Sequence, residues 1–558
     1  ISPFINKQNW RKTSIYDIFE KHKSKASEGC NNFCNLTSDM GCEATKIEDW
    51  QKCMLSPNFK FMPLLADFEY IYPFEVDYLS YPPMTDSRQL PNVSLSKVYM
   101  DGAANGEISC AINDTLRGRV DLVDDFGKHR TIGGDEVRVW MVDKQTQTYK
   151  AAGHVTDLRN GSYQISVRCL WPGKSQLNVA VAYPREYLRV VIQHIHKGIG
   201  WYYAVKFRRQ NIEEVTVCSA TPNIPGRSCV CNLTSVNQQS LYCGRPVDSR
   251  LTCEDWVETF SLPIPPPHNV TPAENNLIKT IPRPISERTI SHNITIVAKS
   301  TGQLPKLKPC SETSPASTWD TEYQPQGYWT SNNWQSLICE RPKMTAAWTI
   351  SCLKNSSVWV FGDSNGVRLV GVTSALTQAE KRTETWPEQF IKTDQQNGIH
   401  FIFTPLEYPV YLGQAWRRRL PYGGVAKQID QIPSNGTHLL MIHYYLHITP
   451  SHLNIAYLRL TAVRDAIQRL LARNPNVVVG IRGPHVSSVE LNFNHAVGGD
   501  NLGRYLLAMT RHVFVDLMHK VILLDGWEMT VALENSWYHP VNTVPAELVR
   551  TLLAFKCS

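Results

Sequence analysis

The sequence contains no apolar run of about 18 residues, the length that a helix needs to cross a bilayer, so we expect no transmembrane segment in this chain. Charged residues are also few, at 19%, while hydrophobic residues reach 42%, which excludes a disordered chain. The net charge of +7 is small for 558 residues, so nucleic acid is not an expected partner. The chain begins at Ile1 without the basic and apolar regions of a signal peptide, and we expect that such a segment has been removed.

Cysteines and glycosylation sequons are, by contrast, plentiful. The 15 cysteines and nine Asn-x-Ser/Thr sequons together indicate the secretory pathway, where disulfides persist and glycans are added. An odd cysteine count leaves at least one thiol free or bonded to another chain, which would allow a disulfide-linked oligomer. We therefore expect a glycoprotein that is secreted, extracellular or resident in the Golgi lumen. The sequons begin at Asn35, Asn92, Asn113, Asn160, Asn232, Asn269, Asn293, Asn355 and Asn435.

Two pairs of cysteines are close enough in sequence to raise the question of a metal site. Cys30 and Cys34 form one pair, and Cys229 and Cys231 form the other. Many zinc sites combine such a pair with two histidines at ligand spacing, and no histidine pair accompanies either of these. We therefore predict no metal site and expect no bound cofactor.

The length of 558 residues predicts two or three domains. Residues 1–105 are irregular and hold four cysteines, so we interpret them as a disulfide-stapled N-terminal extension. Alternating apolar and polar residues between turn signals predict an immunoglobulin-like β-sandwich over residues 106–215. A cysteine-rich segment follows at 216–261, and a proline-rich linker at 262–300. The last domain is predicted to cover residues 301–558.

This last domain has α/β character. Apolar runs at 358–361, 439–442, 477–481 and 521–524 are typical of buried strands. Between the second and the third run, apolar residues recur at helical spacing over residues 460–471. A strand, a helix and a strand in succession imply a parallel sheet.

The first of these runs ends in Gly362, Asp363 and Ser364, at the kind of position where clefts form in open α/β sheets. A serine hydroxyl is a poor nucleophile unless a base lies within hydrogen-bond reach. His539 could supply that base, and Asp525, after the last apolar run, could orient the histidine. A bare Gly-Asp-Ser tripeptide is common by chance, so the prediction depends on the strand before it and on the late histidine.

Several other side chains have two interpretations. His443 and His447 follow the second apolar run and could face the cleft or be structural. Trp329 and Trp334 could stack on a sugar ring or pack in the core. The basic cluster at 416–419 could contact a carboxylate-bearing sugar or be a solvated loop.

The order of several short blocks over residues 106–558 resembles the NXPE family. Members of that family join a neurexophilin-type immunoglobulin-like domain, a cysteine-rich segment and a PC-esterase domain of the Gly-Asp-Ser (SGNH) hydrolase superfamily. No single block is decisive, and the resemblance depends on their order and spacing. The blocks are Phe126-Gly127, Gly133 to Asp135, Val155 to Tyr163, Leu170 to Gly173, Tyr242 to Pro246, Gly327 to Trp334, Cys339, Cys352, Gly362 to Ser364, Asp525 to Thr530, His539-Pro540 and Cys557.

The resemblance implies an SGNH-like α/β domain with a central parallel sheet and a Ser–His site that acts on glycans. The implied reaction is that of an esterase or O-acetyltransferase, including transfer onto sialic acid, through an acyl-serine intermediate. Ser364 would be the nucleophile, His539 the base, and Asp525 or Asp363 the acidic support. The backbone N–H of Ser364 would be one donor to the oxyanion.

Further residues and partners follow from the same resemblance. Gly362, Asn365, Arg368, His447 and Asn535 are candidates for binding the substrate or the oxyanion. An acetyl donor such as acetyl-CoA and a glycan or glycoprotein acceptor are the implied substrates of a transferase. The immunoglobulin-like domain could bind an extracellular protein partner, as neurexophilins do.

The sequence also departs from the superfamily pattern. Three residues, rather than the usual two, separate Ser364 from Arg368, and Ser536 stands where an aspartate often precedes the histidine corresponding to His539. Tyr445 replaces an expected glycine, and loss of one oxyanion donor typically costs about 100- to 1000-fold in rate. The alternative is therefore a catalytically inactive extracellular glycoprotein with a binding or structural role.

Overall fold

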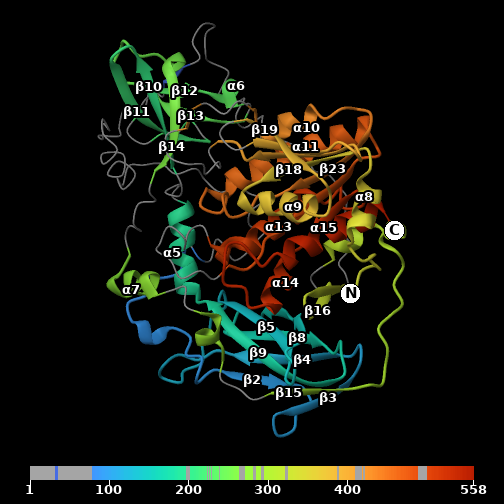
Figure 1. The fold of residues 1–558 in the computed structure, drawn as a ribbon. Coiled ribbons are helices and arrows are strands. Elements are labelled where there is room, and N and C mark those ends of the chain that lie inside the picture. Colours follow the sequence, from blue (N-terminus) through green and yellow to red (C-terminus); the bar gives the residue numbers. More distant parts are fainter. Residues whose placement is uncertain are drawn as a thin grey trace, which may run out of the picture.

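The chain is a mixed α/β protein with several β-sheets and helices packed on them (Figure 1). Cys30, Cys42 and Cys53 of the predicted N-terminal extension lie outside the described residues. The computed structural model describes residues 32–34, 78, 80–196, 202–220, 222, 224, 227, 229–237, 239–262, 270–280, 284–290, 294–320, 325–385, 389–408, 417–418, 422–487 and 499–557.

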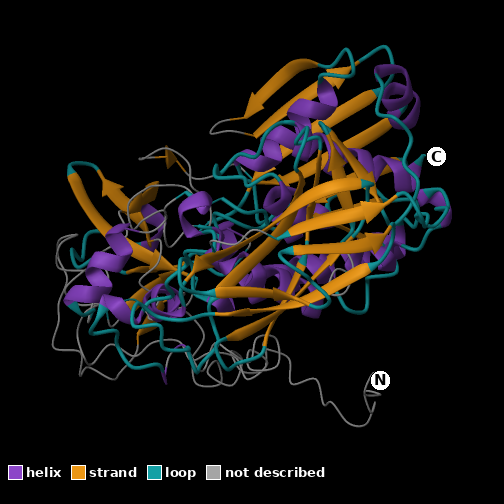
Figure 2. Cartoon of the chain, turned by 90° about the horizontal axis from the view of Figure 1, so that it is seen from below, coloured by secondary structure: helices purple, strands orange, loops and turns teal. Residues whose placement is uncertain are grey.

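Two β-sheets pack against each other around one apolar core in the first part of the chain, which we call the sandwich (Figure 2). Val120, Ile165 and Val167 from one sheet meet Val139 and Val179 from the other. The four-stranded sheet has the order β2 (Lys97–Met100), β4 (Thr115–Asp121), β8 (Ser162–Arg168) and β7 (His154–Asp157). The seven-stranded sheet has the order β17 (Asn333–Ser336), β16 (Gly327–Thr330), β6 (Tyr149–Ala152), β5 (Glu136–Asp143), β9 (Gly173–Tyr183), β15 (Thr295–Lys299) and β3 (Glu107–Ala111).

The strands that alternation predicts in this region are present. Side chains of a strand alternate between its two faces, so Tyr163, Ile165 and Val167 of β8 enter the core together. A disulfide between Cys110 on β3 and Cys169, directly after β8, joins the two sheets. The immunoglobulin-like assignment of this sandwich stays a prediction.

The interval 262–300, which the composition predicts as a linker, holds regular structure. Helix α7 (Pro272–Thr280) lies in it, and β15 pairs in parallel with β3 and antiparallel with β9. Ile296 and Ala298 alternate along β15 and are buried in the sandwich core. This short alternation is hard to recognise among prolines and polar residues, whereas apolar burial in the folded chain recruits it into the sheet. The domain boundaries themselves stay predictions.

The cysteine-rich part forms a third sheet. Two disulfides cross-link it, Cys218–Cys243 and Cys231–Cys253, and Cys229 is also disulfide-bonded. The close cysteine pair at Cys229 and Cys231 is therefore used for disulfides. A short helix, α6 (Thr234–Asn237), follows β12, and α5 (Arg185–His196) precedes β10. The strand order is β1 (Asn32–Cys34), β12 (Cys229–Asn232), β13 (Tyr242–Gly244), β11 (Ile212–Ser219), β10 (Tyr202–Arg209), β14 (Trp256–Leu262) and β22 (Arg417–Arg418).

A mostly parallel sheet forms the centre of the C-terminal part. Its last four strands are the four that the apolar runs predict, and they are neighbours in the sheet. Strand β21 is also parallel to them, whereas β20 and β19 are antiparallel to their neighbours. The order is β19 (Glu380–Thr385), β20 (Gln389–Asp394), β21 (Ile399–Pro405), β18 (Ser356–Gly362), β23 (Thr437–Ile442), β24 (Val478–Arg482) and β25 (Val521–Leu524).

Helices cover both faces of this sheet. Leu440 and Ile442 of β23 enter one core, and Leu439 and Met441 enter the other, because successive side chains point to opposite faces. The first core also holds side chains of α10 (Val425–Asp430), α11 (Leu453–Arg473) and α13 (Gly503–Val513). The second holds side chains of α8 (Ala346–Leu353), α9 (Ser364–Ser374), α14 (Trp527–Ala532) and α15 (Thr543–Lys556).

Helix α14 also contacts the sandwich, and Figure 1 shows it between the sandwich strands and the parallel sheet. Nη2 of Arg138 on β5 lies 2.9 Å from Oδ2 of Asp500, and both side chains are buried. Nε1 of Trp140, on the same strand, donates to Glu534 at 2.9 Å. Residues far apart in the sequence therefore join the sandwich to the C-terminal part through polar contacts, of which the Arg138–Asp500 pair is buried.

Candidate active site

Ser364 is the first residue of helix α9 and lies just beyond the end of strand β18. Asp363 between them is the helix N-cap, and its Oδ1 accepts a hydrogen bond from the N–H of Asn365 at 2.8 Å. Gly362 ends the strand at a close approach, where a Cβ would lie 3.2 Å from the Cβ of His443. Ser364 is therefore at the carboxyl edge of the parallel sheet, where the helix N-terminus favours negative charge.

The structure brings Ser364 and His539 together. Oγ of Ser364 lies 2.7 Å from Nε2 of His539. Ser364 is exposed and His539 is half-buried, so a ligand can reach the pair. Burial and the positive charges of Arg368 and Arg482 lower the pKa of His539, although the charge of Asp363 acts to raise it. A neutral imidazole can accept the serine proton at Nε2 when its own proton is on Nδ1.

Arg368 holds one side of the loop that carries His539. We call residues 533–542, between α14 and α15, the histidine loop. Nη2 of Arg368 donates to the carbonyl oxygen of Pro540 at 2.7 Å and to Oδ1 of Asn542 at 2.6 Å. Arg368 lies one helical turn after Ser364 on α9, so this arginine connects the helix of the serine to the loop of the histidine.

Two other side chains hold the opposite side of the histidine loop. Nε2 of His485 lies 2.8 Å from the carbonyl oxygen of Tyr538. Nδ2 of Asn535 donates to the carbonyl oxygen of Trp537 at 2.8 Å. The backbone is thus hydrogen-bonded by side chains both before and after His539, which restricts where the imidazole can move.

Asp363, the residue directly before the serine, is buried close to His443, His447 and Arg482. Its Oδ1 lies 3.7 Å from Nε2 of His443. Burial opposes the charged form, but His443, His447 and Arg482 lower the pKa of Asp363 to about 2. Burial and the charge of Arg482 lower the pKa of His443 to about 3. At neutral pH, Asp363 is therefore an anion, His443 is neutral, and Arg482 is the balancing cation.

Asp525 forms no hydrogen bond with His539 among the described residues. Its Oδ1 accepts a hydrogen bond from the N–H of Trp527 at 2.8 Å, and burial raises the pKa of Asp525. Strand β25 is three positions from β18 in the sheet, which separates their ends by about 14 Å. Among the described residues no carboxylate hydrogen-bonds to His539, so the expected contact with Asp525 is absent from this part of the chain.

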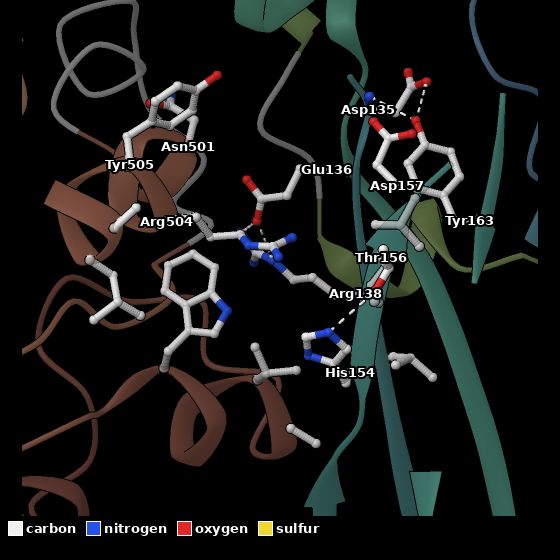
Figure 3. Close-up of a pocket in the computed structure, with 18 of the residues that line it drawn as sticks. Asp135, Glu136, Arg138, His154, Thr156, Asp157, Tyr163, Asn501, Arg504 and Tyr505 are labelled. Carbon is white, nitrogen blue, oxygen red and sulfur yellow. Dashed lines mark hydrogen bonds and ion pairs between the residues drawn. The ribbon is translucent and has the colours of Figure 1, made fainter. Parts of the chain in front are cut away.

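Asp525 instead lines a pocket between the sandwich and the C-terminal part (Figure 3). This pocket has a volume of about 610 Å³. Figure 3 shows Asp135, Asp157 and Tyr163 on the sandwich side and Arg504 on the opposite side. Neither Ser364 nor His539 lines this pocket, so it is separate from the Ser–His pair.

The remaining substrate candidates differ in access. The side chain of Asn365 is buried, and its amide has no hydrogen-bond partner among the described residues. His447 is half-buried and close enough to Asp363 to lower the pKa of that carboxyl.

Tyr445 is buried, and its hydroxyl donates to the carbonyl oxygen of His485 at 2.6 Å. The tyrosine that replaces the expected glycine therefore supports a residue that holds the histidine loop.

The tryptophans considered as sugar contacts belong to the core. Trp329 is 0% exposed and Trp334 is 3% exposed. Nε1 of Trp329 donates to the carbonyl oxygen of Met529 at 2.9 Å, so its polar atom is also satisfied. The core interpretation is thus confirmed. Of the basic cluster 416–419, the structure describes β22, which pairs with β14.

Five disulfides join described cysteines, and these fit a secreted or lumenal glycoprotein. Within the described ranges no helix is both long and apolar enough to cross a membrane. Glycosylation itself stays a prediction. Asn113, Asn160, Asn355 and Asn435 are exposed, Asn92 and Asn232 are half-buried, and Asn35, Asn269 and Asn293 lie outside the described residues. The disulfides are Cys110–Cys169, Cys218–Cys243, Cys231–Cys253, Cys310–Cys339 and Cys352–Cys557.

Sequence reasoning did not identify Arg482 and His485 as parts of this site. Both follow the apolar run 477–481, in the same way that Ser364 follows the run 358–361. Polar residues after parallel strands gather at one edge of the sheet, and that rule could have found them. Nη1 of Arg482 donates to the carbonyl oxygen of Asn365 at 3.1 Å, directly beside the serine.

The fold and the site together define a disulfide-rich α/β protein with a Ser–His pair at the carboxyl edge of a parallel sheet. Residues 334–557 match the family model described as NXPE family member 4-like, C-terminal domain. The resemblance of this chain to the NXPE family is therefore confirmed over its C-terminal part. The matched interval contains Ser364, His539 and all three side chains that hold the histidine loop.

Proposed function

We propose that this chain is a secreted or lumenal glycoprotein whose C-terminal domain is an SGNH-type esterase or O-acetyltransferase acting on glycans. The observation that carries the proposal is the 2.7 Å distance between Oγ of Ser364 and Nε2 of His539 at the start of α9. The disulfides and the similarity to the NXPE4-like C-terminal domain support a secreted or lumenal glycoprotein. We propose acetyl-CoA or another acetyl ester as donor and a sugar hydroxyl, including one of sialic acid, as acceptor.

In the first half of the reaction, Oγ of Ser364 attacks the carbonyl carbon of the acetyl donor, and its proton passes to Nε2 of His539. The bond to the leaving group breaks, and the leaving group departs with that proton. The backbone N–H of Ser364 and the start of α9 stabilise the negative oxygen of the tetrahedral intermediate. An acetyl ester of Ser364 results.

In the second half, the sugar hydroxyl gives its proton to Nε2 of His539 and attacks the acetyl carbon. The ester bond to Oγ breaks, Ser364 recovers the proton, and the acetylated sugar leaves. Water in place of the sugar would give hydrolysis. The buried carboxylate of Asp363 stabilises the protonated imidazole through its charge, because it acts to raise the pKa of His539.

Fluorophosphonate labelling tests this proposal. We expect intact-protein mass spectrometry to show one adduct on the native chain and none on Ser364→Ala. The exposed Ser87 offers a matched control, and Ser87→Ala should label like the native chain. His539→Ala should label at least about 100-fold more slowly, because the general base is missing. A native chain that is folded but not labelled would contradict the proposal.

The alternative, an inactive binding glycoprotein, has one observation in its favour. No carboxylate hydrogen-bonds to His539 among the described residues, so no group within them fixes the imidazole tautomer as an aspartate would. In that case the sandwich would be the part that binds a protein partner. Absence of labelling, together with retained partner binding by the sandwich, would favour this function.

A further inference from the structure

Exposed apolar side chains flank the Ser364–His539 pair along the chain. Trp537 is 55% exposed and Val541 57% exposed, and each is two residues from His539. Val367, on α9 three residues after Ser364, is 38% exposed. Two residues span at most about 7 Å, so the backbone positions of Trp537 and Val541 are close to that of the histidine. Apolar surface is therefore concentrated beside the proposed catalytic pair.

Trp537 is exposed but its backbone is held. Nδ2 of Asn535 donates to the carbonyl oxygen of Trp537 at 2.8 Å, and the carbonyl oxygen of the next residue, Tyr538, accepts from Nε2 of His485 at 2.8 Å. The indole ring packs beside the ring of Tyr538, with centroids 5.9 Å apart. The indole N–H has no hydrogen bond to any other described residue. A ligand that covers this ring would therefore pay little ordering entropy and would find a donor at its edge.

The surroundings of Trp537 distinguish between possible ligands. Glu534, Ser536 and Asn542, in the same loop, are exposed polar residues. The apolar side chains are thus separated by polar ones, which suits neither a long acyl chain nor a large apolar protein interface. A pyranose ring has an apolar C–H face and a polar rim of hydroxyls, and this combination matches an indole ring among polar side chains.

We infer that Trp537 is a binding surface for a pyranose ring of the acceptor saccharide, which presents a hydroxyl to the Ser364–His539 pair. The inference rests on the proposed function for the identity of the reaction, and it adds the residue that selects the acceptor. Trp329 and Trp334, the tryptophans that the sequence suggests for this role, are buried, whereas Trp537 combines exposure with closeness to His539.

The test separates saccharide binding from the reactivity of the serine. Binding of lactose and of sialyllactose is measured by saturation-transfer NMR and calorimetry on full-length Ser364→Ala protein, which cannot turn over. In this Ser364→Ala background, Trp537→Ala should weaken saccharide binding about tenfold. Trp537→Phe, which keeps an aromatic face, should retain most of the saccharide affinity. Phe126→Ala is the matched control, because Phe126 is 61% exposed on the sandwich; it should leave binding unchanged.

Fluorophosphonate labelling of the same substitutions, made with Ser364 intact, supplies the second readout. We expect Trp537→Ala to weaken saccharide binding about tenfold and not to slow labelling by a similar factor. An equal loss in labelling would show that Trp537 only maintains the loop, and this would overturn the inference. Binding that is unaffected by Trp537→Ala, or absent in all variants, would overturn it too. Labelling of the native chain reports on the proposed function separately, because the small probe needs no saccharide contact.

Discussion

Nε2 of His485 lies 2.8 Å from the carbonyl oxygen of Tyr538, the residue directly before His539. Burial, with the positive charge of Arg482, holds the pKa of His485 well below its ordinary value, so this ring is neutral and can donate a hydrogen bond. Arg368 binds the carbonyl oxygen of Pro540 on the other side of His539. The proposed base is therefore positioned through its neighbouring peptide groups, in addition to its contact with Ser364.

Removing either of these positioning side chains should slow the serine. We expect His485→Ala and Arg368→Ala to lower the fluorophosphonate labelling rate by about 10- to 100-fold, because a small displacement of the base weakens proton transfer steeply. Arg368→Lys should not restore the rate fully, since lysine lacks the planar fork that reaches two acceptors. Time-resolved intact mass measures the rate.

Two substitutions serve as controls for this prediction. His400 is exposed on β21, and Arg469 is 55% exposed in its side chain and pairs with Asp430 on the surface. His400→Ala and Arg469→Ala should label at the native rate. If His485→Ala and Arg368→Ala also label at that rate, the hydrogen bonds to the histidine loop do not position His539.

The pH dependence of labelling should reflect the lowered pKa of His539. Burial and the charges of Arg368 and Arg482 lower this pKa below the ordinary value of 6.5, and only the neutral imidazole can act as base. The labelling rate should therefore fall as the pH is lowered, with a midpoint below pH 6.5. Arg368→Ala removes a positive charge and should move the midpoint upward. A native midpoint above 6.5 would contradict this explanation.

The two candidate acids should behave differently when each is changed to its amide. Asp525→Asn should label within about twofold of the native rate, because Asp525 has no hydrogen bond to His539. Asp363→Asn should label about tenfold more slowly, because it removes the charge that stabilises the protonated imidazole. Loss of labelling in Asp525→Asn, with the fold retained by circular dichroism, would show that Asp525 supports the base after all.

The protein should lose stability in mild acid. The pKa of His443 is about 3 in the folded chain, against an ordinary value of 6.5, and the pKa of His485 is also lowered. Below about pH 6.5 the unfolded chain therefore binds protons that the folded chain does not, and each histidine costs on the order of 1 kcal/mol per pH unit until its folded pKa is reached. Asp363, with a pKa of about 2 against 3.8, adds a loss in the same direction below pH 3.8.

Denaturant unfolding monitored at several pH values measures this loss. His443→Gln should flatten the decline between about pH 6.5 and 3, because one buried neutral histidine is gone. His400→Ala, which changes an exposed histidine, should keep the native slope. Equal slopes in the native chain and His443→Gln would mean that His443 is not kept neutral by the fold.

Some features of this protein could be predicted because they depend on neighbours in the sequence. The strands β18, β23, β24 and β25 are buried on both faces, and such strands appear as continuous apolar runs. Helix α11 could be predicted because its apolar residues repeat at helical spacing and Asn474 caps its end. Strand β15 could not, because its short alternation lies in a segment dominated by prolines and polar residues.

The sequence by itself therefore determined the strands and helices of the parallel sheet, the choice of Ser364 and His539, and a disulfide-rich character. Only the tertiary structure decided which groups surround that pair, because the contacts join residues as far apart as 175 positions. Asp525 at the end of β25 accepts a hydrogen bond from the N–H of Trp527 and none from His539 among the described residues, whereas the order of strands brings Arg482 and His485 to the same sheet edge as the serine. Local periodicity carries no information about strand order, whereas the distances between side chains depend on it directly.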